Sequence, residues 1–289
     1  MGIKFNNVSY WYQKPRRKQV AERAIDNITL SLGETPEFVM IVGKTGVGKS
    51  TLLSHINGLL LPSEGSIDVD NFHITRNVHT NPKLKQVRKK IGYVFQFPEY
   101  QLFSDTVLND IAYGAKNFGA TLDEANKIAR EVAATLNIEN ILDNSPFEIS
   151  GGQKRKVAIA GIVAYQPDVY LLDEPTRGLD PRGSVEVMEF FNGLFKNEGK
   201  TIIMITHDMD LVYQYATRVL VLADGKIKFD GKKEELFKEE YQKYGLEKPH
   251  ILALIDLINK NTKYNISYEN YTEDDLIKSL EAAKWIIWQ

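Results

Sequence analysis

The spacing of apolar and polar residues predicts β-structure at the start of the chain. Residues 3–12 and 25–32 alternate partly between apolar and polar positions, which is typical of strands with one buried face. Residues 37–42 (EFVMIV) are mostly apolar and indicate a buried strand. A helical run at 52–57 follows and ends at Gly58, a residue type that commonly terminates helices. We therefore expect paired strands first and a strand–helix unit next.

Short apolar runs alternate with helical segments through the middle of the chain. Thr121 and Glu124 form a capping-box pattern ahead of a helix, and Asp180-Pro181 supplies an N-cap and a first-turn proline for another. The strand-like runs lie at residues 66–69, 91–95, 169–172, 201–206, 218–223 and 226–230. This alternation predicts an α/β fold with a mostly parallel core sheet, joined by antiparallel β-structure at the N-terminus.

The character of the sequence changes after Gly231. Residues 232–289 are charged and helix-rich, and apolar residues at 251, 254, 255 and 258 mark one helical face. A further helix is expected from Thr272 onward, ending in the apolar string WIIW at 285–288. We expect residues 1–231 to form one domain and residues 232–289 a C-terminal helical region.

Composition narrows the classes of function. The chain has 289 residues, no cysteine and a formal net charge of −2. Disulfides, thiolate metal sites and cysteine nucleophiles are excluded, and no global basic field favours nucleic acid as a partner. No run approaches the ~18 apolar residues of a membrane-spanning helix, and the first residues lack a secretory signal pattern. We expect a cytosolic protein that reaches a membrane only from the side.

A glycine-rich motif follows the buried strand at 37–42. The sequence GKTGVGKS at 43–50 matches G-x-x-x-x-G-K-[ST] between a predicted strand and a predicted helix. Glycines let successive backbone N–H groups wrap around phosphates at a helix N-terminus. In such loops the lysine contacts the β- and γ-phosphates and the hydroxyl residue coordinates Mg²⁺. The motif predicts a site for a nucleoside triphosphate and Mg²⁺, formed by Gly43, Lys44, Thr45, Gly46, Val47, Gly48, Lys49, Ser50 and Thr51.

Two adjacent carboxylates follow a later strand. The run at 169–172 leads directly into Asp173 and Glu174, at the strand end where α/β sheets place ligands. Asp173 is suited to hold Mg²⁺, and Glu174 can polarise the attacking water as general base. Such a pair is often structural when it stands alone. Downstream of a phosphate loop in the same sheet, it indicates hydrolysis chemistry.

A third motif, ISGGQ at 149–153, resembles the signature of the ATP-binding cassette (ABC) ATPases, usually written LSGGQ. Ile149 replaces the first leucine. Small residues here run into a helix, so backbone N–H groups and the Ser150 hydroxyl can bind an anion. The resemblance implies that this anion is the γ-phosphate of ATP on an opposing cassette. The residues expected to contact it are Ser150, Gly151, Gly152 and Gln153.

Further residues match motifs of this family in the expected order. By resemblance, Gln96 is the Q-loop glutamine that senses Mg²⁺ and the attacking water, and His207 is the switch histidine that contacts the γ-phosphate. Asp180, in Gly178-Leu-Asp180, matches the D-loop residue at the interface of two cassettes. The candidate metal contacts are therefore Ser50, Gln96 and Asp173.

An aromatic residue near the N-terminus completes the set. Tyr12 matches the residue that stacks on adenine, although Trp11 and Tyr10 compete for this role. The resemblance covers roughly residues 3–231 and implies a helical subdomain at about 97–165.

Two longer stretches carry the resemblance further. Residues 94–107 (VFQFPEYQLFSDTV) and 145–161 (SPFEISGGQKRKVAIAG) look like the second A-component ATPase of energy-coupling factor (ECF) importers for vitamins and metals. Arg177 departs from that family, which usually has a small residue before Gly-Leu-Asp, and this bears on the dimer contacts.

The resemblance implies a set of partners. A second cassette, a paralogue or another copy of this chain, would complete the ATP sites, and residues 232–289 would help to hold the pair together. A transmembrane T component and a substrate-binding S component would anchor the pair at the cytoplasmic face of the membrane. Nucleic acid is not expected.

Two other classes of ABC protein stay open. The first is the ATPase of a conventional importer with an extracellular binding protein, which a larger β-rich C-terminal domain would favour. The second is a soluble ABC ATPase without a transport role, against which the near-neutral charge and the lack of insertions count.

Overall fold

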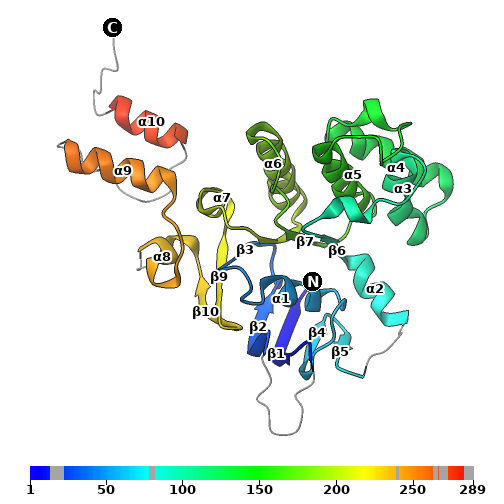
Figure 1. The fold of residues 1–289 in the computed structure, drawn as a ribbon, viewed down its shortest axis with the longest axis horizontal. Coiled ribbons are helices and arrows are strands. Elements are labelled where there is room, and N and C mark those ends of the chain that lie inside the picture. The colour runs from blue at the N-terminus through cyan, green and yellow to red at the C-terminus, as the bar shows by residue number, and fades with distance from the viewer. Residues whose placement is uncertain (14–22, 78–81, 239–240, 263–265, 267–272, 283–289) are drawn as a thin grey trace.

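A six-stranded sheet forms the centre of the molecule (Figure 1). The computed structural model describes residues 1–13, 23–77, 82–238, 241–262, 266 and 273–282. The strand order is β10 (Lys226–Gly231), β9 (Arg218–Ala223), β3 (Phe38–Val42), β8 (Thr201–Ile205), β7 (Val169–Asp173) and β6 (Ile91–Val94). All neighbours are parallel except β10 and β9. The predicted, mostly parallel core sheet is confirmed.

A second sheet contains the N-terminal strands. Its order is β2 (Ile25–Leu32), β1 (Ile3–Tyr10), β4 (Glu64–Val69) and β5 (Phe72–Ile74), and every pairing is antiparallel. The predicted antiparallel β-structure is confirmed. The short strand β5 was not predicted, because three residues show too little periodicity.

Each face of the central sheet is covered by its own apolar cluster. Along β3, Val39 and Ile41 join the cluster that reaches the antiparallel sheet and α1 (Lys49–Ile56). Phe38, Met40 and Val42 face the other way, toward the helices. Because both faces are buried, the strand is apolar throughout, as the run at 37–42 predicted.

A lobe of helices lies beside β6 and β7 (Figure 1). It contains η1 (Pro98–Gln101), α3 (Val107–Asn117), α4 (Leu122–Thr135), η2 (Glu139–Ile141) and α5 (Gly151–Val163), and α2 (Pro82–Lys90) precedes β6. Both hydrogen bonds of the predicted capping box form at Thr121 and Glu124. Ala125, Ala129 and Ala133 are fully buried, so α4 packs closely against its neighbours.

Helix α6 (Pro181–Glu198) connects β7 to β8. Asp180 accepts a hydrogen bond from Gly183 N (2.7 Å) as its N-cap, and Pro181 begins the helix, as the sequence predicts. Helix α7 (Met209–Tyr215) then follows β8, with Asp208 as the N-cap.

The C-terminal part consists of α8 (Lys233–Lys238), η3 (Tyr241–Tyr244), α9 (His250–Asn261) and α10 (Glu273–Ala282). Leu236 and Tyr241 pack into the main core. Figure 1 shows α9 and α10 beside the body of the molecule, on the side opposite the α3–α5 lobe. No described helix is long and apolar enough to span a membrane.

Helix α9 is attached to α7 by apolar and polar contacts. Leu252 and Ile255 share a cluster with Tyr213 of α7. His250 N donates to Asp210 Oδ1 (2.6 Å). The predicted apolar face of α9 is only partly correct, because Leu254 is 45% exposed whereas Leu252 is buried. The predicted WIIW string at 285–288 lies outside the described residues.

Candidate active site

The loop between β3 and α1 requires glycine at two positions. A Cβ atom added to Gly43 would lie 2.2 Å from Leu222 O, and one added to Gly48 would lie 2.1 Å from Ala24 O. Both glycines also have positive φ, 141° and 103°. The loop therefore packs directly on neighbouring backbone, and its N–H groups lead into the N-terminus of α1, a geometry suited to phosphate.

Lys49 is held inside this loop. Its side chain is 6% exposed, and Nζ donates to Gly43 O (2.7 Å) and Lys44 O (2.9 Å). Burial lowers the pKa of Lys49, whereas the charges of Glu174 and Asp173 raise it. The ammonium group thus lies among carbonyls of the phosphate loop. It interacts electrostatically with Asp173, at the end of β7, and with Glu174, the next residue.

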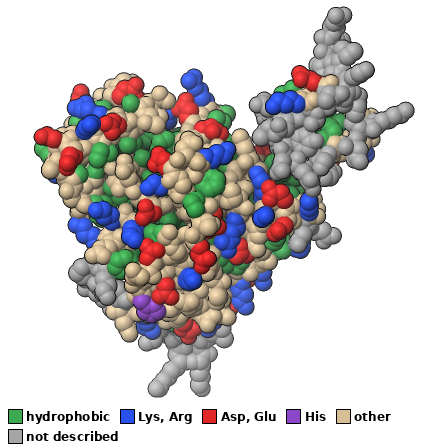
Figure 2. Space-filling view, turned by 180° about the vertical axis from the view of Figure 1, so that it is seen from behind, with side chains coloured by type: hydrophobic (Ala, Val, Ile, Leu, Met, Phe, Trp, Pro, Cys, Tyr) green, Lys and Arg blue, Asp and Glu red, His purple; other side chains and the backbone are tan. Residues whose placement is uncertain are grey.

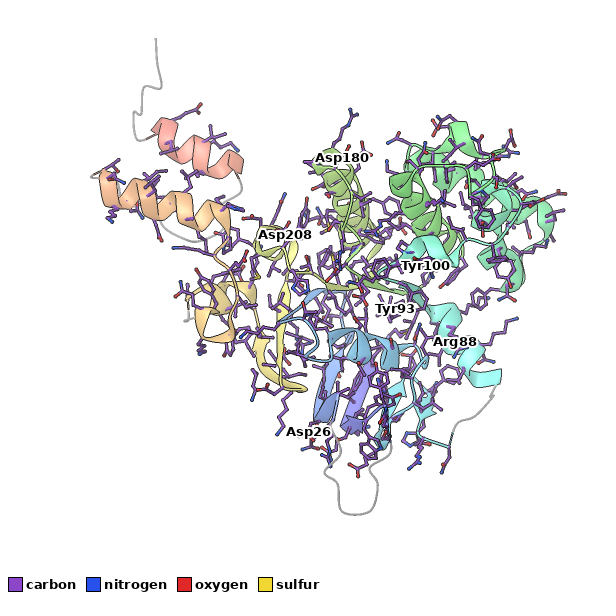
Figure 3. The ribbon with its side chains drawn as sticks, in the orientation of Figure 1. Asp26, Arg88, Tyr93, Tyr100, Asp180 and Asp208 are labelled. Carbon is purple, nitrogen blue, oxygen red and sulfur yellow. The ribbon has the colours of Figure 1, made fainter. Side chains whose placement is uncertain are left out.

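Asp173 lies at the end of β7 and is only 4% exposed. Burial raises the pKa of Asp173, and the charge of Glu174 adds to this shift. Hydrogen bonds from the hydroxyls of Ser50 and Tyr93 lower it, as does the charge of Lys49. Tyr93 Oη lies 3.5 Å from Asp173 Oδ2, and Figure 3 shows Tyr93 near the middle of the molecule.

Ser50 and Asp173 together fit Mg²⁺. They pair a hydroxyl with a buried carboxylate beside the phosphate loop. Among the described residues there is no group of three or more His, Cys, Asp or Glu side chains that could hold a metal by itself. Mg²⁺ suits such a site, because it commonly takes one or two protein oxygens and completes its shell with phosphates and water.

Three neighbouring strands deliver the predicted catalytic residues to one point. Gln96 follows β6, Glu174 follows β7 and His207 follows β8. Gln96 Nε2 donates to Glu174 Oε2 (3.0 Å), and His207 Nε2 lies 2.9 Å from Glu174 Oε1. The structure therefore brings these three side chains into direct contact.

Glu174 has a third contact, which the sequence did not predict. Arg177 Nη1 lies 2.9 Å from Glu174 Oε2. Burial by itself raises the pKa of Glu174, but hydrogen bonds from Gln96 and Arg177 and the charges of His207 and Arg177 outweigh it, so the pKa lies below its usual value. The carboxylate is therefore ionised at neutral pH, as a general base must be.

Tyr12 is the exposed member of the N-terminal aromatic group. Its ring is 66% exposed, whereas Tyr10 and Trp11 are half-buried. Tyr12 Oη lies 2.9 Å from Thr51 Oγ1, which places the ring beside α1. Beneath it, the Tyr10 ring packs edge-on against fully buried His55, with 4.8 Å between ring centroids. Stacking of Tyr12 on adenine stays a prediction.

The signature belongs to the helical lobe, and its residues Ser150 and Gly151 are exposed. Ser150 is the N-cap of α5: its Oγ accepts from Gln153 N (3.3 Å), and Gln153 Oε1 accepts from Ser150 N (2.9 Å). Asp180 is also exposed, and Figure 3 shows it at one end of α6, apart from Tyr93 in the sheet. The hydrogen bonds described for Ser150 and Asp180 stay within their own helices and do not reach Glu174.

Sequence reasoning also missed Asp110, which shapes the loop after Gln96. It is 8% exposed on α3 and accepts from Phe103 N (3.3 Å) and Ser104 N (3.1 Å). An acidic residue between Val107 and Ile111, on the apolar face of a helix, was the available signal.

Known proteins with similar sequences point to one family. Residues 25–177 match the sequence model of the ABC transporter family. The energy-coupling factor transporter ATP-binding protein EcfA2 of Ligilactobacillus salivarius is 48% identical over 240 residues, which cover 83% of this chain and 82% of that protein. The protein of the same name from Clostridium tetani is 42% identical over 284 residues, 97% of this chain and 96% of that protein.

Solved structures agree with the sequence matches. The structure of cbiO1 from Clostridium perfringens, described as part of the ABC transporter complex cbiONQ, has a TM-score of 0.70 at 36% identity and covers 88% of this chain and 98% of its own. The ATP-binding cassette MJ0796, a dimer in a post-hydrolysis state with ADP and Pi, has a TM-score of 0.72 at 30% identity, covering 80% and 98%. The chain therefore belongs to the ABC transporter ATPases and, within them, to the energy-coupling factor transporter ATP-binding proteins.

Proposed function

We propose that this chain is the ATP-hydrolysing motor subunit of an energy-coupling factor importer, which drives uptake of vitamins or other micronutrients. The observation that carries this proposal is the contact of Gln96 and His207 with Glu174, next to the phosphate loop. A carboxylate that is held from both sides, and that is ionised because its pKa lies below the usual value, is positioned to accept a proton from the attacking water.

The other residues of the site bind and orient the nucleotide. The loop N–H groups and Lys49 bind the phosphates, and the exposed ring of Tyr12 stacks on adenine. Ser50 and Asp173 hold Mg²⁺, which neutralises charge on the phosphates when it is bound. His207 and Gln96 orient the water and the γ-phosphate around Glu174.

We further propose that the chain acts in a pair. Ser150 and Gly151 are exposed and belong to the helical lobe, so they are free to contact ATP on another molecule. The similar cassette MJ0796 was solved as a dimer, which supports the same arrangement here. The partner is a second ATP-binding cassette, and residues 232–289 extend the contact between the two.

The docking surface for the transmembrane component lies next to Gln96. Phe97, Tyr100 and Phe103 are 48%, 84% and 59% exposed, which is unusual for three aromatic residues so close in sequence. Phe103 also packs edge-on against the half-exposed ring of Tyr113, with 4.8 Å between ring centroids. We define these four residues as the aromatic surface. A helix of the membrane component would anchor there.

The charge on the face drawn in Figure 2 does not favour nucleic acid. Figure 2 shows one face of the molecule, on which basic and acidic side chains are interspersed. Association with the membrane therefore runs through protein partners at its cytoplasmic face.

The test uses Tyr100→Asp and Phe103→Asp in the assembled transporter. Both variants should fold and bind ATP, but co-purification with the membrane subunit and substrate uptake should fall at least about tenfold, since each places a charge in an apolar contact. Leu122→Asp, which changes a 53% exposed residue at the start of α4, is the matched control. Normal uptake in both aromatic variants would place the docking surface elsewhere. Partners of another kind in the purified complex would favour a conventional importer or a soluble ATPase.

A further inference from the structure

We propose that Arg155 is a positioning residue that joins the signature helix α5 to the segments that carry Gln96 and Glu174. The inference rests on the proposed function, because it assigns Ser150 to the ATP of the partner and Glu174 to the ATP of this chain. Arg155 would then couple the two ATP sites of a pair through the interior of one chain.

The contacts of Arg155 span three parts of the chain. The residue lies in the first turns of α5 and is 7% exposed. Its Nη1 donates to the carbonyl oxygens of Glu174 (3.4 Å), Pro175 (3.5 Å) and Arg177. Its Nη2 donates to Gln96 O (3.3 Å). One planar guanidinium thus links Gln96, in the segment after β6, to the turn after β7.

The turn after β7 needs such support. Glu174 has φ of +51°, a left-handed conformation that is strained for a residue with a side chain and persists only where the surroundings hold it. Arg155 holds the carbonyl groups on both sides of the turn. Arg177, whose carbonyl accepts from Arg155, in turn places its own guanidinium on Glu174 Oε2. The position of the carboxylate therefore depends on Arg155.

The other end of the link is stiff. Ser150 caps α5 through reciprocal bonds with Gln153, and the helix runs without a break to Val163. Arg155 lies five residues after Ser150, or about 7.5 Å along the axis. A force on the signature therefore reaches the turn without a flexible segment between them.

A role in stability alone is the competing explanation. It predicts that variants of Arg155 lower the midpoint of thermal unfolding while the folded fraction keeps its turnover number. Positioning predicts a loss of kcat with ATP affinity retained, because the carbonyl groups that accept from Arg155 belong to Gln96 and to the turn that carries Glu174.

The experiment compares Arg155→Gln and Arg155→Lys in the complete transporter, with ATP as the probe. Arg155→Gln should lower kcat about tenfold or more, with KM and the Kd for ATP within about twofold. Arg155→Lys keeps the charge but loses the planar fork, so it should recover only part of kcat. Arg182→Gln, at a side chain that is 90% exposed, is the control and should match the unaltered protein. Unchanged kcat in Arg155→Gln would overturn the proposal.

A double variant tests the coupling itself. Ser150→Ala should lower turnover less in the Arg155→Gln background than in the unaltered protein, because the link is already broken. If the fold-reductions in turnover of the two single variants simply multiply in the double variant, the proposed coupling is overturned. If Arg155→Gln does not fold, the same cycle is run with Arg155→Lys.

Glu174→Gln separates the two proposals. If Glu174→Gln retains turnover, the proposed function is wrong. If Glu174→Gln is inactive but the effects of the Arg155 and Ser150 variants multiply, only this inference is refuted.

Discussion

The phosphate loop and the signature are both glycine-rich helix starts, yet the structure treats them differently. Lys49 and Asp173 are buried and already have partners within the chain. Ser150 and Gly151 are exposed, and the hydrogen bonds of Ser150 serve only its own helix. This difference agrees with the proposed pairing, in which the chain supplies one half of a site complete and offers the other half to a second molecule. Four variants test this contrast.

The largest effect is expected from Glu174→Gln, in the buried half. The change keeps the shape of the side chain and removes its basicity, so turnover should fall about a hundred- to ten-thousandfold while ATP binding is retained. Steady-state hydrolysis by the assembled complex and an ATP titration measure both. Glu131→Gln, at an exposed position of α4, is the control. Turnover above half of normal would show that Glu174 is not the base.

Lys49→Ala should weaken nucleotide binding itself. The change removes the buried ammonium group that the proposed function assigns to the phosphates, and the Kd for ATP should rise about ten- to a hundredfold. Calorimetric titration of the isolated chain measures it, with Lys85→Ala on α2 as a control. Equal affinity in both variants would contradict the contact assigned to Lys49.

Ser150→Arg should separate the two halves most directly. ATP binding by the isolated chain should stay within about twofold of normal, whereas turnover by the assembled pair should fall about tenfold or more, because the signature serves the ATP of the partner. The two measurements use the same preparation before and after assembly. Loss of binding by the isolated chain would refute the division into two halves.

The last variant concerns stability rather than binding or turnover, through His55 behind the phosphate loop. Burial lowers the pKa of His55 to about 4, from 6.5 when exposed. The unfolded chain therefore takes up a proton that the folded chain excludes, and stability is lost as the pH falls from about 6.5 to 4. The loss is roughly 3 kcal/mol. In His55→Leu this part of the loss should vanish, as measured by chemical denaturation at pH 7.5 and pH 4.5. Equal losses in both proteins would contradict the assignment.

The sequence predicted Glu174 from its place after a strand, and Gln96 and His207 from their resemblance to motifs of the family. The three side chains meet because the neighbouring parallel strands β6, β7 and β8 end at the same edge of the sheet. The contact of Arg177 with Glu174 could not be predicted, since it depends on the left-handed backbone at Glu174. Arg155 was missed for a related reason: the partners named for it are backbone carbonyls, which leave no pattern in the sequence.

The buried face of α9 could be predicted from the sequence only in part, for the same reason. Periodicity located the helix, but it placed Leu254 inside and did not single out Leu252. The orientation is decided by Tyr213 of α7, against which α9 packs. A partner far away in the sequence therefore set the rotation of the helix about its axis.

Because α9 is attached to α7, a small tilt of α7 produces a larger displacement at the far end of α9. Helix α7 begins just after His207, and α9 is fixed to it through Tyr213 and the bond from His250 to Asp210. Twelve helical residues span about 18 Å, so a tilt of α7 by about 5° would displace the far end of α9 by about 1.5 Å. A spectroscopic label on Asn261 would thus read, at a distance, how the histidine end of the site is moving.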